Sequence, residues 1–201
     1  MANRSYLYST NVIPGPEVRK AERRFIGISE WNYDIPIIHK LLLSGTPRAC
    51  SSSIWNNPDE IAIVGDFTEG VDRLRDFLRR IDLPAAQPLA AEALEFLAQD
   101  ANRNPYFVLE AGEIFDMGSD PFPEQNARLL DEIRNLEPQI DHALAALSTR
   151  PAGTEKPRGL LASLFGVKSK PTETLIDPLQ SIRALGLGNW SNVLYFHFDD
   201  A

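Results

Sequence analysis

The sequence predicts a single α+β domain, with a mixed or mostly antiparallel sheet and helices packed on one face of that sheet. Hydrophobic residues make up 43% and charged residues 24% of the 201 residues, which is the balance of a chain that buries one sizeable core. Segments rich in β-branched and aromatic residues alternate irregularly with segments whose apolar residues recur at helical spacing. A doubly wound parallel sheet requires regular alternation, so the irregular order favours an antiparallel arrangement.

Five segments are predicted to be strands, because β-branched and aromatic residues dominate them. They are residues 6–8, 25–28, 60–65, 106–109 and, near the end of the chain, 192–198. Ile114 and Phe115 are expected to extend the fourth of these strands or to pair with it.

Five further segments carry apolar residues at the spacing of one helical face. They are residues 35–44, 68–83, 88–101, 123–147 and 177–187. Asp66 or Thr68 is expected to cap the second helix, since both side chains accept bonds from backbone N–H groups. Pro138 falls inside the longest helix and predicts a kink or a break there.

The chain is expected to form one domain in three parts. Residues 1–149 form the main α+β body, residues 150–174 a flexible basic loop, and residues 175–201 a helix and a strand that complete the same domain. The loop is rich in proline and glycine and carries a net charge of +3, which leaves −11 for the rest of the chain. Residues 160–165 within the loop are apolar, and a role in touching an anionic membrane or a partner groove stays open.

The charge of the protein limits its partners. The net charge is −8 and the isoelectric point is about 4.9. An acidic surface repels phosphate backbones and anionic lipids, so nucleic acid and stable membrane association are disfavoured. A basic protein is the partner that such a surface attracts, although acidity also serves solubility alone.

The cell compartment is expected to be the cytoplasm. Cys50 is the single cysteine, so the chain has no internal disulfide and no cysteine pair for zinc. The N-terminal residues contain no apolar stretch of the kind found in signal peptides, and no run of about 18 apolar residues occurs.

Motifs that identify enzymes are absent from the sequence. It contains no phosphate-binding glycine loop, zinc-peptidase motif, nucleophile elbow or paired-cysteine motif, which favours a protein that is not an enzyme and binds no cofactor and no metal. The alternative is an enzyme or a small-ligand protein with a dispersed site. In that case His39 acts with Asp34 or Glu30, or His197 acts with Asp199.

Two sets of residues are candidates for binding a partner protein. The first is an acidic run that forms either a solvated loop or the rim of a binding surface. It comprises Glu110, Glu113, Asp116, Asp120 and Glu124. The second set consists of Trp31, Tyr33 and Trp55, which lie near predicted loops. Such aromatic residues are enriched in interfaces, and they also commonly close the ends of a core.

Four stretches of the chain carry a resemblance to known proteins. Residues 1–8 resemble the start of a bacterial family of unknown function. Residues 31–45, 60–66 and 192–198 are similar in layout to YfbM-like α+β proteins, in which a tryptophan-led helix precedes a strand and an aromatic strand ends the chain. The resemblance extends to proteins encoded near toxin–immunity loci. It implies an α+β fold and a non-enzymatic immunity protein that neutralises a toxin through an acidic surface, and it transfers no site residue.

Overall fold

The computed structural model describes residues 2–148 and 178–198. Its centre is an open five-stranded sheet with the order β2-β1-β5-β4-β3. All four neighbouring pairs are antiparallel, which confirms the predicted α+β class and the antiparallel sheet. The strands are β1 (Arg4–Thr10), β2 (Phe25–Asn32), β3 (Arg48–Cys50), β4 (Ala62–Asp66) and β5 (Tyr106–Glu110).

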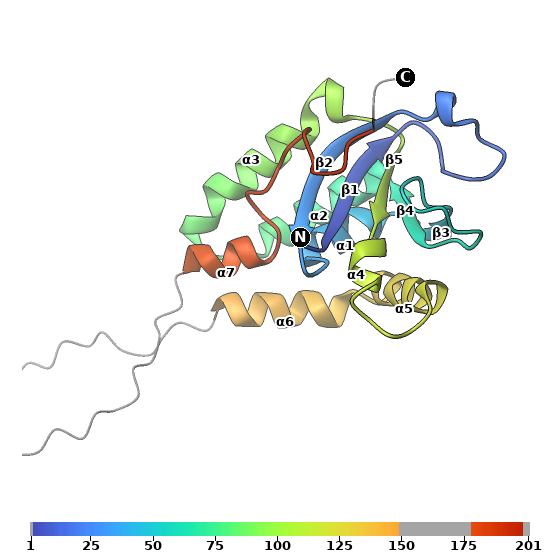
Figure 1. Cartoon of the computed structure of the whole chain (residues 1–201). Helices are drawn as coiled ribbons and strands as arrows, with labels where there is room; N and C mark the ends of the chain where they lie inside the picture. Colours follow the sequence, from blue (N-terminus) through green and yellow to red (C-terminus); the bar gives the residue numbers. More distant parts are fainter. Residues whose placement is uncertain (1, 149–177, 199–201) are drawn as a thin grey trace, which may run out of the picture.

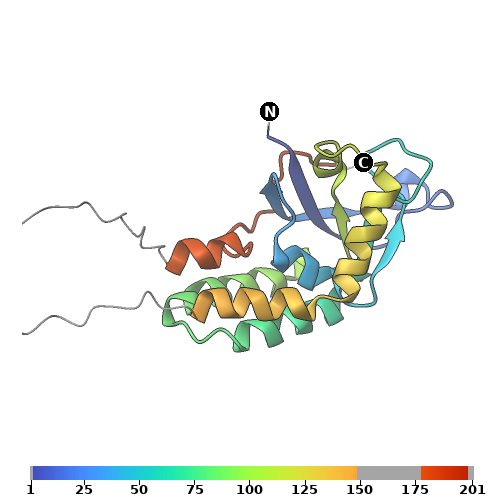
Figure 2. The ribbon, with the colours of Figure 1, turned by 90° about the horizontal axis from the view of Figure 1, so that it is seen from below.

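Helices gather on one side of this sheet (Figures 1 and 2). They are α1 (Ile37–Leu43), α2 (Phe67–Arg79), α3 (Gln87–Ala98), α4 (Gly112–Phe115), α5 (Phe122–Arg134), α6 (Glu137–Ser148) and α7 (Pro178–Ala184). Short 3₁₀ turns span Lys20–Glu22, Pro84–Ala86 and Asp100–Asn102. In the described parts of the chain, none of these helices is both long enough and apolar enough to cross a membrane.

Helix α1 carries the chain from one edge of the sheet to the other, because β2 and β3 are the two edge strands. It lies between the sheet and α2, and most of its side chains are buried. Two glycines allow this close approach. A Cβ atom on Gly65 of β4 would collide with the carbonyl oxygen of Leu43, and one on Gly70 of α2 would collide with that of Leu42.

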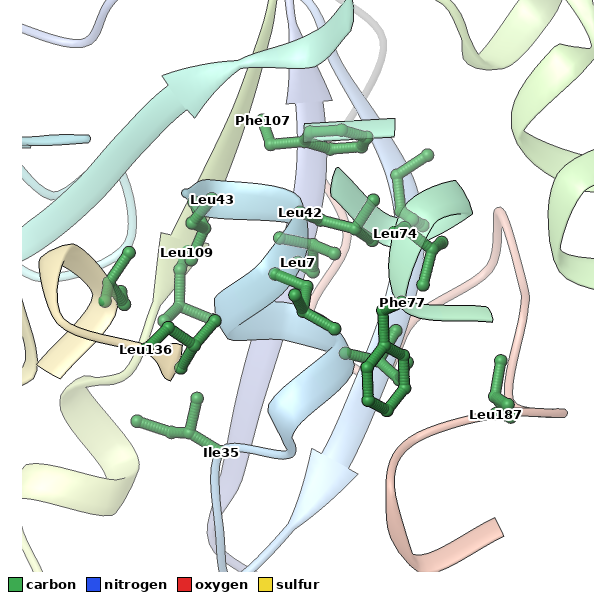
Figure 3. Packing of buried hydrophobic residues seen from close by; sticks show 14 of the residues in the cluster. Leu7, Ile35, Leu42, Leu43, Leu74, Phe77, Phe107, Leu109, Leu136 and Leu187 are labelled. Carbon is green, nitrogen blue, oxygen red and sulfur yellow. The ribbon is translucent and has the colours of Figure 1, made fainter. Parts of the chain in front are cut away.

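The helix-covered face of the sheet forms the larger core. Leu7, Leu109 and Phe107 project from it toward Leu42 and Phe77 (Figure 3). Phe107 also stacks on Phe67 of α2, with ring centroids 4.3 Å apart. Strand alternation predicts this, because every second residue of β1 and β5 points to the same face.

The opposite face of the sheet is covered by loops and by the last described residues. Its buried cluster contains Tyr6, Tyr8, Cys50, Ala62, Val64, Val108 and Leu194. Phe196 and Phe198 pack against this cluster, and the Phe198 ring lies 5.2 Å from that of Tyr8. We call this the loop-covered face.

The predicted closing strand at residues 192–198 is wrong. A single bridge joins Trp190 to Ser29, and the residues that follow have no strand geometry up to residue 198. The side-chain amide of Asn192 donates to the carbonyl oxygen of Gly27, in the place where a strand would use its backbone N–H. The segment therefore runs beside β2 (Figure 1) and covers that edge without extending the sheet.

Two shorter segments differ from the prediction, and a third agrees with it. Ile114 and Phe115 belong to helix α4 instead of a strand, since the chain turns directly after β5. Strand β3 was not predicted, because three residues give too short a pattern. The predicted break near Pro138 is confirmed, as α5 ends at Arg134 and α6 starts at Glu137. The predicted basic loop at 150–174 lies outside the described residues.

Candidate functional site

One end of the sheet collects the predicted binding residues. At this end β1 begins, while β2 and β5 finish and α4 follows directly (Figure 1). The register places Tyr6 between Glu30 of β2 and Glu110 of β5, and it pairs Arg4 with Asn32. Antiparallel pairing thus brings residues from three distant parts of the sequence together at this end of the sheet.

Helix α4 is fixed at this end by Glu113. The Tyr6 hydroxyl donates to Glu113 Oε1 at 2.8 Å, and the Arg4 backbone N–H donates to Glu113 Oε2 at 2.9 Å. Burial, together with the nearby Glu113 carboxylate, raises the pKa of the Tyr6 hydroxyl above its ordinary value. On its other side α4 touches Trp55, because a Cβ atom on Gly112 would collide with that indole.

Arg4 ties the C-terminal segment to the same end. Its Nε lies 3.3 Å from Glu30 Oε1, and its guanidinium lies 4.2 Å from the centre of the Tyr195 ring. The Tyr195 backbone N–H donates to Glu30 Oε2 at 2.6 Å. This arrangement combines an ion pair with a cation–π contact, and the sequence alone did not indicate it.

Trp31 and Tyr33 lie at the end of β2. Trp31 is half-buried and lines a cavity with Arg183 and Leu187. Tyr33 is 60% exposed and has a φ of 63°, which is uncommon for a residue other than glycine. These two aromatic residues are therefore separated from the acidic run by the width of β1.

Glu110 does not belong to an exposed acidic rim, and that part of the prediction is corrected. It is only 1% exposed, because its position on β5 faces the loop-covered cluster. Its carboxylate accepts bonds of 2.6 Å from the Ser52 hydroxyl and from the Ser53 backbone N–H. Burial raises its pKa to about 7, although those hydrogen bonds oppose the shift.

Glu110 thereby fixes the loop that carries Trp55. The Ser52 hydroxyl that donates to Glu110 also accepts from the backbone N–H groups of Ile54 and Trp55, at 3.1 and 2.8 Å. The carboxylate and the hydroxyl together satisfy four donors, one hydroxyl and three backbone N–H groups, in a segment without regular structure.

The exposed acidic residues lie in the two chain segments that supply an aromatic pair. The rings of Trp55 and Phe122 meet edge to face at 5.7 Å, and both side chains are half-buried. We define the acidic–aromatic surface by its members, which are Trp55, Asp59, Glu60, Asp116, Met117, Asp120, Phe122 and Glu124. Glu60 is joined to helix α5, since its carbonyl oxygen accepts from the Asn126 side chain at 2.9 Å.

Most carboxylates of the acidic–aromatic surface have no ion-pair partner among the residues of the described ranges. Asp120 pairs with Arg128 at 2.6 Å, whereas Asp59, Asp116 and Glu124 form no ion pair there. Met117, which follows Asp116 in the chain, is 54% exposed. The sequence reasoning missed Met117 and Phe122, although the prolines flanking Phe122 in an acidic loop were a usable signal.

The His39 site of the alternative hypothesis is not assembled. His39 is fully buried, and neither ring nitrogen has a hydrogen-bond partner in the part of the chain described. Burial alone lowers its pKa to about 3. The Asp34 carboxylate instead accepts from the Ile35 backbone N–H at 2.7 Å, and Glu30 contacts Arg4.

His197 lines a small cavity with Tyr8 and Phe25, while its proposed companion Asp199 lies outside the described residues. Cys50 is a buried free thiol whose pKa is raised by burial. Within residues 2–148 and 178–198, no three His, Cys, Asp or Glu side chains are arranged to hold a metal ion.

Comparison with known proteins identifies a family. No curated protein and no solved structure matches the chain. The model of a family described as a domain of unknown function (DUF7822) matches residues 11–150, a range that begins in the loop after β1 and includes all of α6 and the acidic–aromatic surface. The match agrees with the expected family of unknown function, whereas the likeness to YfbM-like and immunity proteins stays a prediction. The chain belongs to the DUF7822 family.

Proposed function

We propose that the protein is a non-enzymatic binding module that recognises a basic protein through its acidic–aromatic surface. One observation carries the proposal. The Trp55–Phe122 pair is half-buried, and the chain segments next to it carry exposed carboxylates, of which Asp59, Asp116 and Glu124 have no ion-pair partner among the described residues.

The physical properties of this surface suit association. Tryptophan is frequent among the residues that dominate binding energy, and methionine adapts to the shape of a partner. A negative field accelerates encounter with a basic protein and weakens as salt is added. Neutralisation of a toxin by an immunity protein in the bacterial cytoplasm is the specific form of this proposal, because the acidic surface would occlude a basic active site.

The alternative of an enzyme gains no support from the histidines. His39 is enclosed in the core without a partner in the described structure, and the acidic groups expected beside it are engaged elsewhere. A general acid or base must reach its substrate, and a fully buried imidazole does not.

A capture experiment with matched variants tests the proposal. The bait is the full chain, and the candidates are the products of neighbouring genes expressed one at a time. We expect one basic product to be retained by the wild type and lost with Asp116→Asn/Glu124→Gln. Glu92→Gln/Glu95→Gln changes the net charge equally on helix α3 and should retain it. Equal retention by both variants would show that the binding site lies elsewhere.

A further inference from the structure

A second site lies on the other side of the molecule from the loop-covered face. It is a cleft of about 430 Å³ between α2, the end of α1, and the junction of α5 with α6. The volume falls within the range of small-molecule pockets. None of the residues that define the acidic–aromatic surface lines it.

The floor of the cleft is apolar. Five side chains of the main core reach it from four helices and the α5–α6 junction, and all of them are buried. They are Leu41, Phe77, Ile133, Leu136 and Ile140. An apolar body placed on this floor would leave water.

The charges on the rim are unevenly paired. Arg80 spans the cleft to Glu137 and Asp141, at 3.4 and 2.7 Å. Arg73 forms no ion pair and no hydrogen bond with any described residue. Arg134 has one pair, at 3.6 Å, with Asp131 on its own helix. Two guanidinium groups at the rim are thus available for an anion.

The acidic side chains of the rim are already engaged. Glu69 accepts from the Thr46 hydroxyl at 2.9 Å, and Asp76 pairs with Arg79 at 2.8 Å. Their negative charge still disfavours a ligand of charge −2, such as a phosphate monoester, relative to one of charge −1.

The backbone at Thr46 is strained. Thr46 lines the cleft and has a φ of 49°, a conformation that β-branched residues rarely adopt. Strain of this kind concentrates at functional sites. The Thr46 hydroxyl donates to Glu69, which ties the segment that follows α1 to helix α2.

We propose that this cleft binds a small monocarboxylate with an apolar body. The carboxylate lies between Arg73 and Arg134, and the apolar body lies on the floor formed by Leu41, Phe77 and Ile133. The site is independent of the protein-binding proposal, since the two share no residue.

Titration of the full chain with simple probes tests the ligand class. Octanoate is expected to bind at least tenfold more tightly than acetate, because only octanoate covers the apolar floor. Octylammonium, which has the same length and the opposite charge, should not bind measurably. Octanoate that fails to bind at millimolar concentration, or octylammonium that binds equally well, would overturn the proposal. Displacement of octanoate by millimolar inorganic phosphate would overturn the monocarboxylate assignment.

Variants of exposed arginines locate the site. Arg73→Gln/Arg134→Gln is expected to weaken octanoate binding at least tenfold, with the thermal unfolding temperature retained as evidence of folding. Arg75→Gln alters an arginine of α2 that pairs with Asp72, and neither residue lines the cleft, so the affinity should stay unchanged. Equal affinity in the wild type and in the Arg73→Gln/Arg134→Gln variant would contradict the assignment.

Discussion

The two faces of the sheet are buried by different means. The helix-covered face is packed by side chains such as Leu7 and Phe107, while the loop-covered face buries Tyr6, Tyr8 and Glu110 beside its apolar residues. A helix satisfies most of its own backbone hydrogen bonds, so its face needs only apolar complements. A loop leaves N–H and C=O groups that the sheet must satisfy.

The polar groups of the loop-covered face meet that need directly. The Tyr8 hydroxyl donates to the Phe196 carbonyl oxygen at 2.8 Å, and Glu110 accepts from the Ser53 backbone N–H. The difference between the two faces indicates that the buried polar side chains of the loop-covered face hold loops in place. The acidic–aromatic surface is built on one of those loops and therefore depends on Glu110 for its shape.

Equivalent leucine truncations should show that the helix-covered face contributes more stability. Leu109 and Leu194 are both almost fully buried, on the helix-covered and loop-covered faces respectively. We expect Leu109→Ala to cost about 4 kcal/mol and Leu194→Ala about 2 kcal/mol, because the C-terminal segment can move to fill the cavity. Urea unfolding measures both. Equal losses of unfolding free energy would show that the helices and the loops cover the sheet with equal rigidity.

Gly70→Ala is the second prediction and reports on the tightness of the helix layer. Alanine in place of glycine within a helix ordinarily adds about 1 kcal/mol of stability. Here the new Cβ would collide with the Leu42 carbonyl oxygen, so we expect a loss of about 3 kcal/mol instead. Gly15→Ala is the control, since a Cβ atom there would meet no other atom within 4 Å, and its unfolding free energy should be almost unchanged. A stabilising Gly70→Ala would refute the close contact.

The third prediction concerns the pH dependence of the loop-covered face. The pKa of Glu110 is raised from 4.5 to about 7, so the folded state holds a proton that the unfolded state releases. Its contribution to stability is complete below pH 4.5 and is lost as the pH rises through 7, by about 3 kcal/mol at most. Glu110→Gln should remove this loss, so its unfolding free energy between pH 5 and pH 8 falls less than that of the wild type. Parallel curves of unfolding free energy against pH for the variant and the wild type would refute the assignment to Glu110.

His39 should give the opposite dependence on the helix-covered side. Its pKa is lowered from 6.5 to about 3, so its contribution is complete above pH 6.5 and is lost as the pH falls toward 3. Between pH 7 and pH 5 the expected loss is about 2 kcal/mol. His39→Leu, which has no titrating group, should lose less over this interval in urea unfolding. An identical loss in the variant would assign the acid sensitivity to other groups.

Much of the fold follows from the sequence, because the longer elements have clear patterns. β1, β2, β4 and β5 and the amphipathic helices lie where β-rich composition and helical spacing predict them. The segment at 192–198 has the composition of a strand, yet Asn192 bonds the sheet edge through its side chain. Composition does not reveal whether a residue bonds the sheet edge through its backbone or through its side chain.

The site was only partly predictable, because burial depends on the fold. Asp116, Asp120 and Glu124 are exposed as expected, whereas Glu110 has the same chemistry and lies in the core. Tyr6, which pairs with Glu110 on the neighbouring strand, is distant in sequence. Only the strand register therefore reveals that the Glu110 side chain faces inward. The link from Glu110 through Ser52 to Trp55 likewise requires coordinates.

Hydrogen–deuterium exchange of the captured complex tests the central claim most directly. Binding through the acidic–aromatic surface predicts slower exchange in peptides covering residues 54–60 and 116–124. Peptides from helix α3 should exchange at the same rate in the free and bound protein. Protection confined to other segments, with residues 116–124 unchanged, would contradict the account.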